Sequence, residues 1–337
     1  MRRNAGFSLI ELMISAAIVI IVMVGITQAF TTQHQTYVVV YQVTEAQQNL
    51  RAVVDLIERD VRRAGFMVPP HAAVCGWDQA TGPDTLFVSN TDAILTVFDL
   101  EDADEDLSGD LGAPVNGVTT NWGPGGGSFS FVLTRTWADV ADADGDSTTD
   151  VDFAVGEGVI LVASRQQDGL AACGIIETIS GTTLTANFGS TTFRSTAAGE
   201  NAGVVAVPAH VYRVFAGSPN QLRRDGPLLA SDVEDFQLSY FFDLDDDRVL
   251  DGGEDYGSSG GTAQPWELSP ASNRPDFSTL REVGINIVTA TRDDDPNRHY
   301  QIGAGEVTGN RTAGSLPSAD GKRRRVSTAR VRVRNAS

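Results

Sequence analysis

The residues that decide the fold of this chain are Phe7 to Phe30, FSLIELMISAAIVIIVMVGITQAF. Most of them are Ile, Val, Ala, Met or Leu, and no Asp, Glu, Lys or Arg occurs from Leu12 to Thr44. As a helix, residues 7–30 would be about 36 Å long at roughly 1.5 Å per residue, enough to cross the ~30 Å hydrocarbon core of a bilayer. The stretch is therefore predicted to be a membrane-spanning helix.

The segment that precedes this helix is short and basic. Arg2 and Arg3 predict a cytoplasmic N-terminus and an exported remainder by the positive-inside rule. We find no convincing small-residue cleavage site between the apolar run and the polar residues 31–35, so the helix is expected to stay in the mature protein. Glu11 is out of place here, because a carboxylate toward the bilayer interior costs about 2.5 to 3.5 kcal/mol. It requires a partner.

Residues 6–13, GFSLIELM, resemble the cleavage and methylation motif of type IV prepilins and type II secretion pseudopilins. In this family a basic leader ends in Gly, and the mature chain begins with Phe and has Glu as its fifth residue. The resemblance implies that a prepilin peptidase cuts between Gly6 and Phe7 and that the new Phe7 amine is methylated. It also implies that Glu11 pairs with the N-terminal amine of a neighbouring subunit in a filament core. The alternative is an ordinary membrane anchor with an interfacial Glu.

The helix is predicted to continue through an amphipathic second half, residues 31–65, with Gly65 as its C-cap. Apolar residues recur there at spacings of three and four, and charged residues fill the other faces. The apolar set is Val39, Val43, Ala46, Leu50, Val53, Val54, Ile57 and Val61, and the charged set is Glu45, Arg51, Asp55, Glu58, Arg59, Asp60, Arg62 and Arg63.

Residues 48–66, QNLRAVVDLIERDVRRAGF, are similar to the same region of PilW-type minor pilins, which are related to the minor pseudopilin J of type II secretion. Those chains carry an Asn, an Arg, an apolar pair, Arg-Asp and Ala-Gly-aromatic in this order, and then a Cys. This chain departs from the pattern, because its cysteine is delayed to Cys75.

Beyond Phe66 the pattern changes to short β-branched or apolar runs separated by Gly, Pro, Asn and Asp. It predicts an α+β, pilin-like fold in which the long helix packs on a mostly antiparallel sheet. The β-rich domain spans 66–337, with a loop-rich insertion at about 90–154. The predicted strands are Thr85–Ser89, Phe129–Thr134, Gly158–Ala163, Gly174–Ile179, Val211–Phe215, Asp235–Phe242, Glu282–Ala290 and Arg325–Arg334.

The two cysteines, Cys75 and Cys173, would lie in an oxidising compartment if the domain is exported. A disulfide is favoured over two free thiols, and closing a loop of about 100 residues is worth up to about 4.7 kcal/mol in the chain-entropy model. Sequence alone does not show that their Cα atoms approach each other.

Three acidic segments share the spacing D-x-D-x-D-x-x-x-D, which resembles the first nine positions of an EF-hand calcium loop. Only the third is followed by a Glu at position 12, Glu254. Position 6, where an EF-hand has Gly, holds Leu107, Ser147 or Arg248. We expect one to three Ca²⁺ ions; the alternative is solvated acidic loops. The ligands would be Asp102, Asp104, Asp106 and Asp110; Asp142, Asp144, Asp146 and Asp150; and Asp243, Asp245, Asp247 and Asp251 with Glu254.

Charge and motifs exclude several functions. The chain has 44 Asp and Glu against 25 Lys and Arg, a net charge of −19, which disfavours nucleic-acid binding. The only basic patch is C-terminal, where the run 322–325, KRRR, is followed by Arg330, Arg332 and Arg334 in alternation with valine. The alternation is typical of a strand or a subunit interface, and a contact with DNA is the alternative. No hydrolase, phosphate-loop or nucleotide motif occurs, so the chain is expected not to be an enzyme.

These features together predict a minor pilin of a type IV pilus that helps to initiate assembly or lies at the tip. Its expected partners are other major and minor pilins, the prepilin peptidase and the inner-membrane assembly platform. We expect it in the inner membrane, with the domain periplasmic, and then in the pilus at the cell surface. The alternatives are a type II secretion minor pseudopilin and a calcium-dependent adhesin displayed on a pilus.

Overall fold

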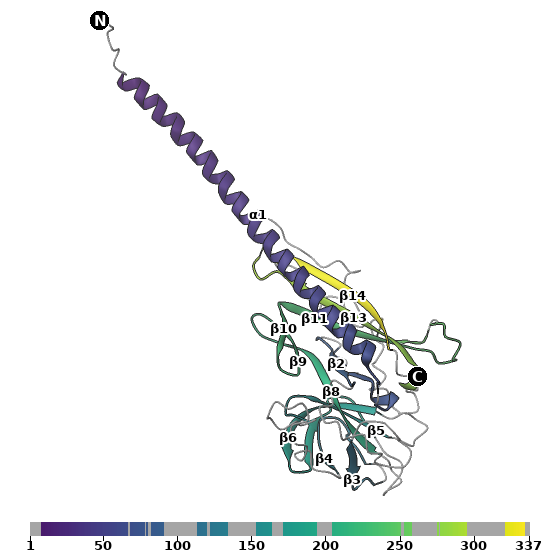
Figure 1. The fold of residues 1–337 in the computed structure, drawn as a ribbon. Helices are drawn as coiled ribbons and strands as arrows, with labels where there is room; N and C mark the ends of the chain where they lie inside the picture. The colour runs from purple at the N-terminus through teal and green to yellow at the C-terminus, as the bar shows by residue number, and fades with distance from the viewer. Residues whose placement is uncertain are drawn as a thin grey trace, which may run out of the picture.

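One long helix, α1 (Leu9–Arg63), projects from a head of β-strands (Figure 1). The N-terminal half of α1 extends away from the head, and its C-terminal half lies along strands of the head. The structure is a computed structural model that describes residues 8–66, 68–77, 79, 82–90, 113–119, 122–133, 153–163, 171–193, 204–250, 253–257, 275, 277–294 and 321–333.

Local signals define both ends of α1. At its start, Ser8 Oγ accepts a hydrogen bond from the Glu11 amide while the Glu11 carboxylate accepts one from the Ser8 amide, a capping box. At its end, Gly65 takes a left-handed φ of 78°, and its amide donates to the Ser89 carbonyl. Arg62 and Arg63 lie in the last turn, where positive charge is favoured by the helix dipole.

A four-stranded antiparallel sheet supports the C-terminal half of α1. Its order is β12 (Asp255–Tyr256), β11 (Val233–Phe242), β13 (Leu280–Ala290) and β14 (Arg324–Arg332), and α1 contacts β13 and β14. Five of the eight residues of the predicted apolar stripe are buried here, Leu50, Val53, Val54, Ile57 and Val61, whereas Val39, Val43 and Ala46, nearer the N-terminus, are only half-buried. Along β14, Val331 is buried and Arg330 and Arg332 are exposed, as the alternation predicts.

Six antiparallel strands close into a barrel that has its own hydrophobic core, with Phe131, Leu161 and Phe188 among its buried residues. The circuit closes because β5 pairs with both β6 and β8. The strands, in order around the barrel, are β8 (Val204–Phe215), β3 (Ala113–Asn116), β4 (Ser128–Leu133), β7 (Thr183–Asn187), β6 (Ala171–Ser180) and β5 (Gly158–Ala163).

The long strand β8 joins the barrel to the rest of the head. Its first half belongs to the barrel, whereas His210 to Phe215 pair with β2 and β9. The additional strands are β1 (Val74–Trp77), β2 (Thr85–Val88), β9 (Gln221–Arg224) and β10 (Leu228–Ser231). The short 3₁₀ turns η1 (Pro70–Ala72) and η6 (Phe277–Thr279) complete the described elements.

The fold class predicted from the sequence is confirmed: a long apolar helix packs on a mostly antiparallel β domain, and each of the eight predicted strands coincides with an observed one. The architecture is richer than predicted, since there are two sheets and one of them closes. Strands β3 and β4 lie within segment 90–154, predicted to be loop-rich, and contribute to the barrel.

Asp60, one of the charged residues that flank the apolar stripe of α1, is buried in the structure. Its side chain is fully buried, and its Oδ2 accepts a hydrogen bond from Tyr212 Oη on β8 and lies 3.1 Å from Arg224 Nη2 on β9. Burial and the Asp60 carboxylate raise the pKa of Tyr212 above its ordinary value, so the tyrosine remains a donor. The charged residue is tolerated in the core because the head supplies its partners.

Candidate functional site

The N-terminal half of α1 presents an apolar surface that the head does not cover. Leu9, Ile21 and Phe30 are 80%, 72% and 71% exposed, and none of the most apolar 18-residue window is buried. The helix is long and apolar enough to span a membrane. A surface of this size is stable only against lipid or the apolar surfaces of other chains.

Glu11 lies at the start of this surface, on the first turn of α1. Its carboxylate is exposed and accepts the Ser8 amide at 3.2 Å. The predicted processing residues, Gly6 and Phe7, lie outside the described residues. The capping box has a sequence signature, Ser-x-x-Glu, which residues 8–11 carry, so this intramolecular partner of Glu11 is predictable from the sequence.

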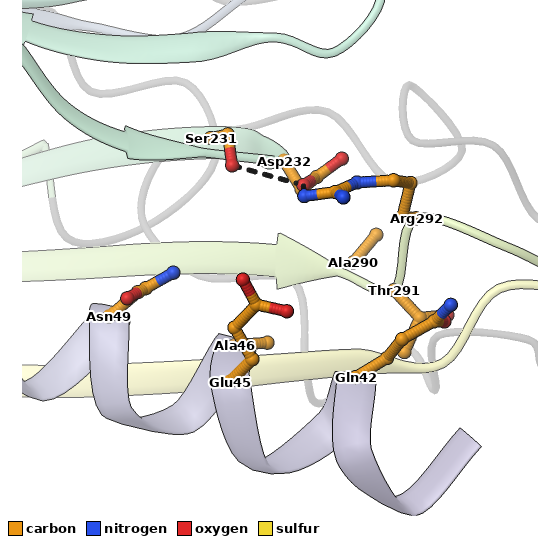
Figure 2. A pocket seen from close by; sticks show the side chains of 9 residues that line it. All are labelled: Gln42, Glu45, Ala46, Asn49, Ser231, Asp232, Ala290, Thr291 and Arg292. Carbon is orange, nitrogen blue, oxygen red and sulfur yellow. Dashed lines mark hydrogen bonds and ion pairs between the residues drawn. The ribbon is translucent and has the colours of Figure 1, made fainter. Parts of the chain in front are cut away.

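Where α1 first meets the head, the contact is polar and small. A cleft of about 30 Å³ lies between the helix and the ends of β10 and β13, with Glu45 and Asn49 on one wall (Figure 2). Gln42 hydrogen-bonds Asp293 across this junction, and Arg292 lies 3.7 Å from Asp232. The cleft has room for about one water molecule, so it is a small polar gap between helix and head.

The acidic loop that follows β11 brings three of the predicted calcium ligands together. Asp243, Asp245 and Asp247 each offer a carboxylate oxygen, and the three oxygens lie within 4.8 Å of one another. Asp243 is fully buried, and its Oδ1 has no hydrogen-bond partner among the described residues. Hard, closely spaced oxygen donors fit Ca²⁺, and a buried carboxylate oxygen without a donor is costly unless a cation approaches it.

The charges of this loop affect one another. A hydrogen bond from the Asp247 amide lowers the pKa of Asp245, but desolvation and the nearby carboxylates of Asp247, Glu254 and Asp243 together raise that pKa above its ordinary value. Mutual repulsion of this kind is relieved by a bound cation. Glu254 is buried near the loop, and its Oε1 accepts the Leu244 amide at 2.8 Å.

Arg248, at the position where an EF-hand has Gly, adopts φ 66°. The sharp turn is thus made in the left-handed region without glycine, at a cost of about 1 kcal/mol or more. Asp251 lies outside the described residues. The same holds for all the candidates in the other two loops: Asp102, Asp104, Asp106, Asp110, Asp142, Asp144, Asp146 and Asp150.

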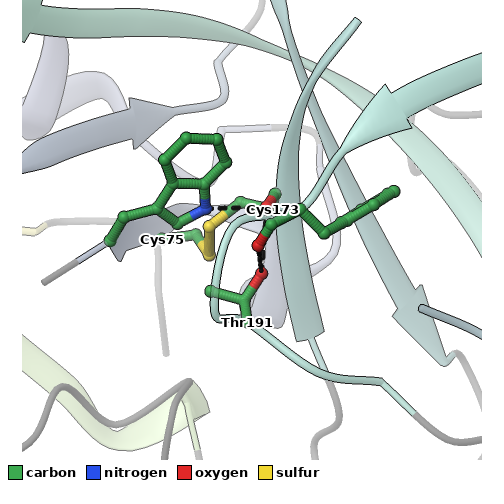
Figure 3. The surroundings of a disulfide bond; sticks show 5 residues. Cys75, Cys173 and Thr191 are labelled. Carbon is green, nitrogen blue, oxygen red and sulfur yellow. Dashed lines mark hydrogen bonds between the residues drawn. A yellow bond between two sulfur atoms is a disulfide. The ribbon is translucent and has the colours of Figure 1, made fainter. Parts of the chain in front are cut away.

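Cys75 on β1 and Cys173 on β6 form a disulfide, with Cα atoms 6.1 Å apart (Figure 3). Both residues are fully buried. The carbonyl of Cys173 accepts hydrogen bonds from Trp77 Nε1 at 2.9 Å and Thr191 Oγ1 at 3.0 Å. The disulfide therefore connects β6 of the barrel to β1, which lies outside the barrel, at a point that is already well packed.

Comparison with known proteins identifies a known motif at the N-terminus. Residues 1–27 match the family model of the prokaryotic N-terminal methylation motif. No curated protein matches the chain. Among solved structures, a type IV-like pilin from Thermus thermophilus is similar over 86% of this chain and 96% of its own, at 11% identity and a TM-score of 0.32. That likeness is too low to carry an argument. The comparisons thus show a prokaryotic N-terminal methylation motif over residues 1–27, a segment that includes the first turns of α1.

Proposed function

We propose that this chain is a minor pilin of a type IV pilus, resembling the PilW type, that helps to initiate assembly or occupies the tip. The observation that carries the proposal is the bare apolar surface of α1 with Glu11 at its start, joined to a methylation motif. Other pilins would cover this surface in the filament, after the prepilin peptidase and the inner-membrane assembly platform have acted. The head would be periplasmic before assembly and extracellular afterwards, and its role would be structural rather than enzymatic.

A minor pseudopilin of type II secretion is the alternative that the same anchor supports. The genes beside this one distinguish the two, because minor-pilin genes would accompany a pilus subunit and secretion-channel genes a pseudopilin. A calcium-dependent adhesin is a further alternative, and surface-binding assays with and without chelator test it.

Intact-mass analysis of the chain purified from its membrane tests the processing step. We expect loss of residues 1–6 and gain of one methyl group on Phe7. A Gly6→Val variant should keep its leader, because a branched side chain at the cleavage position obstructs the peptidase. A parent chain that retains residues 1–6 would contradict the proposal.

We also propose that the loop starting at Asp243 binds Ca²⁺, with Asp243, Asp245 and Asp247 as ligands and Asp251 and Glu254 as candidates to complete the set. The support is the buried Oδ1 of Asp243, which has no hydrogen-bond partner within the described part of the chain, beside two exposed carboxylates. The ion would neutralise the loop and hold it against the end of β11. The loops at 102–110 and 142–150 are proposed as further sites from their spacing alone.

Calorimetric titration of the detergent-solubilised chain with Ca²⁺ tests this loop. We expect binding in the parent at millimolar Ca²⁺ or below. Asp245→Ala with Asp247→Ala should weaken the binding assigned to this loop at least about tenfold, since two of its charged ligands are lost. Asp55→Ala, an exposed acid on α1, is the control and should bind as the parent does. No heat in the parent at millimolar Ca²⁺ would reject the site.

A further inference from the structure

A β-bulge aims one arginine into the acidic loop. In the β11–β13 ladder Phe241 pairs with Glu282, whereas Phe242 pairs with Leu280, so Arg281 is the additional residue between two successive pairs. The Asp243 amide then donates to the Thr279 carbonyl at 3.0 Å, which fixes the start of the loop beside the bulge. Bulges redirect side chains in this way, and here the redirected side chain is a cation.

The guanidinium of Arg281 bridges two acids of the loop. Its Nε lies 3.2 Å from Asp243 Oδ2, and its Nη2 lies 3.4 Å from Asp246 Oδ1. The Arg281 side chain is 21% exposed and that of Asp243 is fully buried, so the first pair is poorly screened. One oxygen of the first ligand position is thereby occupied, and Oδ1 of the same carboxylate, which no described residue hydrogen-bonds, is left for a second cation.

The other arginine of the loop does not share this role. Arg248 is exposed and forms no ion pair among the described residues. Arg281 is therefore the positive group that contacts the loop carboxylates directly in the described part of the chain.

We infer that Arg281 is a resident cation that holds the Asp243–Asp247 loop in place and sets how weakly it binds a divalent ion. The inference rests on the proposed calcium loop. A guanidinium this close to the first ligand repels an incoming Ca²⁺ and withholds Asp243 Oδ2 from bidentate coordination. Without the ion, the same contact keeps the loop folded. The bulge thus lowers the affinity of the loop for Ca²⁺ and keeps the loop formed before the ion binds.

The test compares two neutral variants, Arg281→Gln and Arg281→Met, with the charge-preserving Arg281→Lys, all as full chains in detergent. We expect both neutral variants to bind Ca²⁺ about tenfold more tightly than the parent, equivalent to about 1.4 kcal/mol. Arg281→Lys should stay within about threefold of the parent, because it keeps the repelling charge. Arg292→Gln removes a charge from the other end of β13, well beyond a Debye length, and should change nothing.

Hydrogen exchange gives a second measurement that needs no metal. In calcium-free buffer, the amides of Leu244, Asp247 and Val249 should exchange faster in the neutral variants than in the parent, and Ca²⁺ should restore their protection. These amides donate to Glu254, Asp245 and Asp247 within the loop. Unchanged exchange in both neutral variants would overturn the holding role of Arg281.

The outcomes separate this inference from the calcium proposal. If the parent binds and the neutral variants bind equally or more weakly, the inference is wrong and the calcium loop stands. If neither binds, both are rejected. If only the neutral variants bind, Arg281 is confirmed as the resident cation, and calcium is rejected as a ligand of the parent loop.

Discussion

Replacing Glu11 with Gln should leave the chain inserted in the membrane and reduce its incorporation into filaments about a hundredfold or more. In the proposed filament the Glu11 carboxylate is buried against the N-terminal amine of a neighbour. Removing one partner of such a pair costs about 3–5 kcal/mol, since the remaining charge has no compensation. That energy corresponds to more than a hundredfold in an equilibrium constant. Membrane fractionation and the amount of the chain in sheared filaments measure the two steps.

The capping box provides a control variant that separates the ion pair of Glu11 from its role at the helix end. Glu11 also accepts the Ser8 amide in the isolated chain, so an assembly defect could arise from a frayed helix end rather than from a lost ion pair. Gln at this position still completes a capping box, whereas Ser8→Ala removes the cap, at about 1 kcal/mol, and keeps the carboxylate. We therefore expect Ser8→Ala to assemble nearly normally. If Glu11→Gln and Ser8→Ala impaired assembly equally, the helix cap rather than the ion pair would account for the defect.

Much of the fold could be predicted from the sequence because its signals are local. The apolar run after Phe7 and the three-and-four spacing that follows determine one helix, and the structure ends it at Arg63, before Gly65. The alternation of Arg330, Val331 and Arg332 likewise predicts a strand with its valine buried, and the structure places that strand at the edge of its sheet. In each case the burial of a side chain follows from its position within a single element.

The closed barrel could not be predicted in this way, because closure depends on pairing between distant segments. Ile160 lies opposite both Cys173 and Val207, and nothing in these short apolar runs specifies that β5 should pair on both sides. Strand β3 was missed for a related reason: four residues that include Pro114 carry almost no strand signal.

The acidic loop was only partly predictable. Its spacing identified Asp243, Asp245 and Asp247, and the structure places these three together. The sequence showed Arg248 at the position where an EF-hand has Gly, but it did not show that Arg248 itself adopts the left-handed conformation, which disfavours any residue with a side chain. The sequence gives no indication that Arg281 contacts the loop. Arg281 lies 38 residues from Asp243 along the chain, and the bulge that brings them together depends on the pairing of two strands.

Asp60 shows the limit of helical periodicity most clearly, and it carries the second large prediction. Replacing Asp60 with Ala should lower the free energy of unfolding of the head by about 3–5 kcal/mol, because Arg224 and the Tyr212 hydroxyl would lose their shared buried partner. Asp60→Asn should cost less, since an amide oxygen still accepts from Tyr212. Asp55→Ala, on the exposed side of the same helix, should change stability by no more than about 0.5 kcal/mol.

The position of Asp60 also predicts where stability is lost. It lies in the last turn of α1 and connects that turn to β8 and β9, whereas the barrel has a separate core. In Asp60→Ala, the amides of Ile57 to Arg63 should therefore lose hydrogen-exchange protection while those of β7 keep theirs. A double-mutant cycle with Arg224→Ala should return a coupling energy well above zero, because the two groups share one buried contact. If Asp60→Ala and Asp55→Ala were equally stable, the buried anchor between helix and head would be disproved.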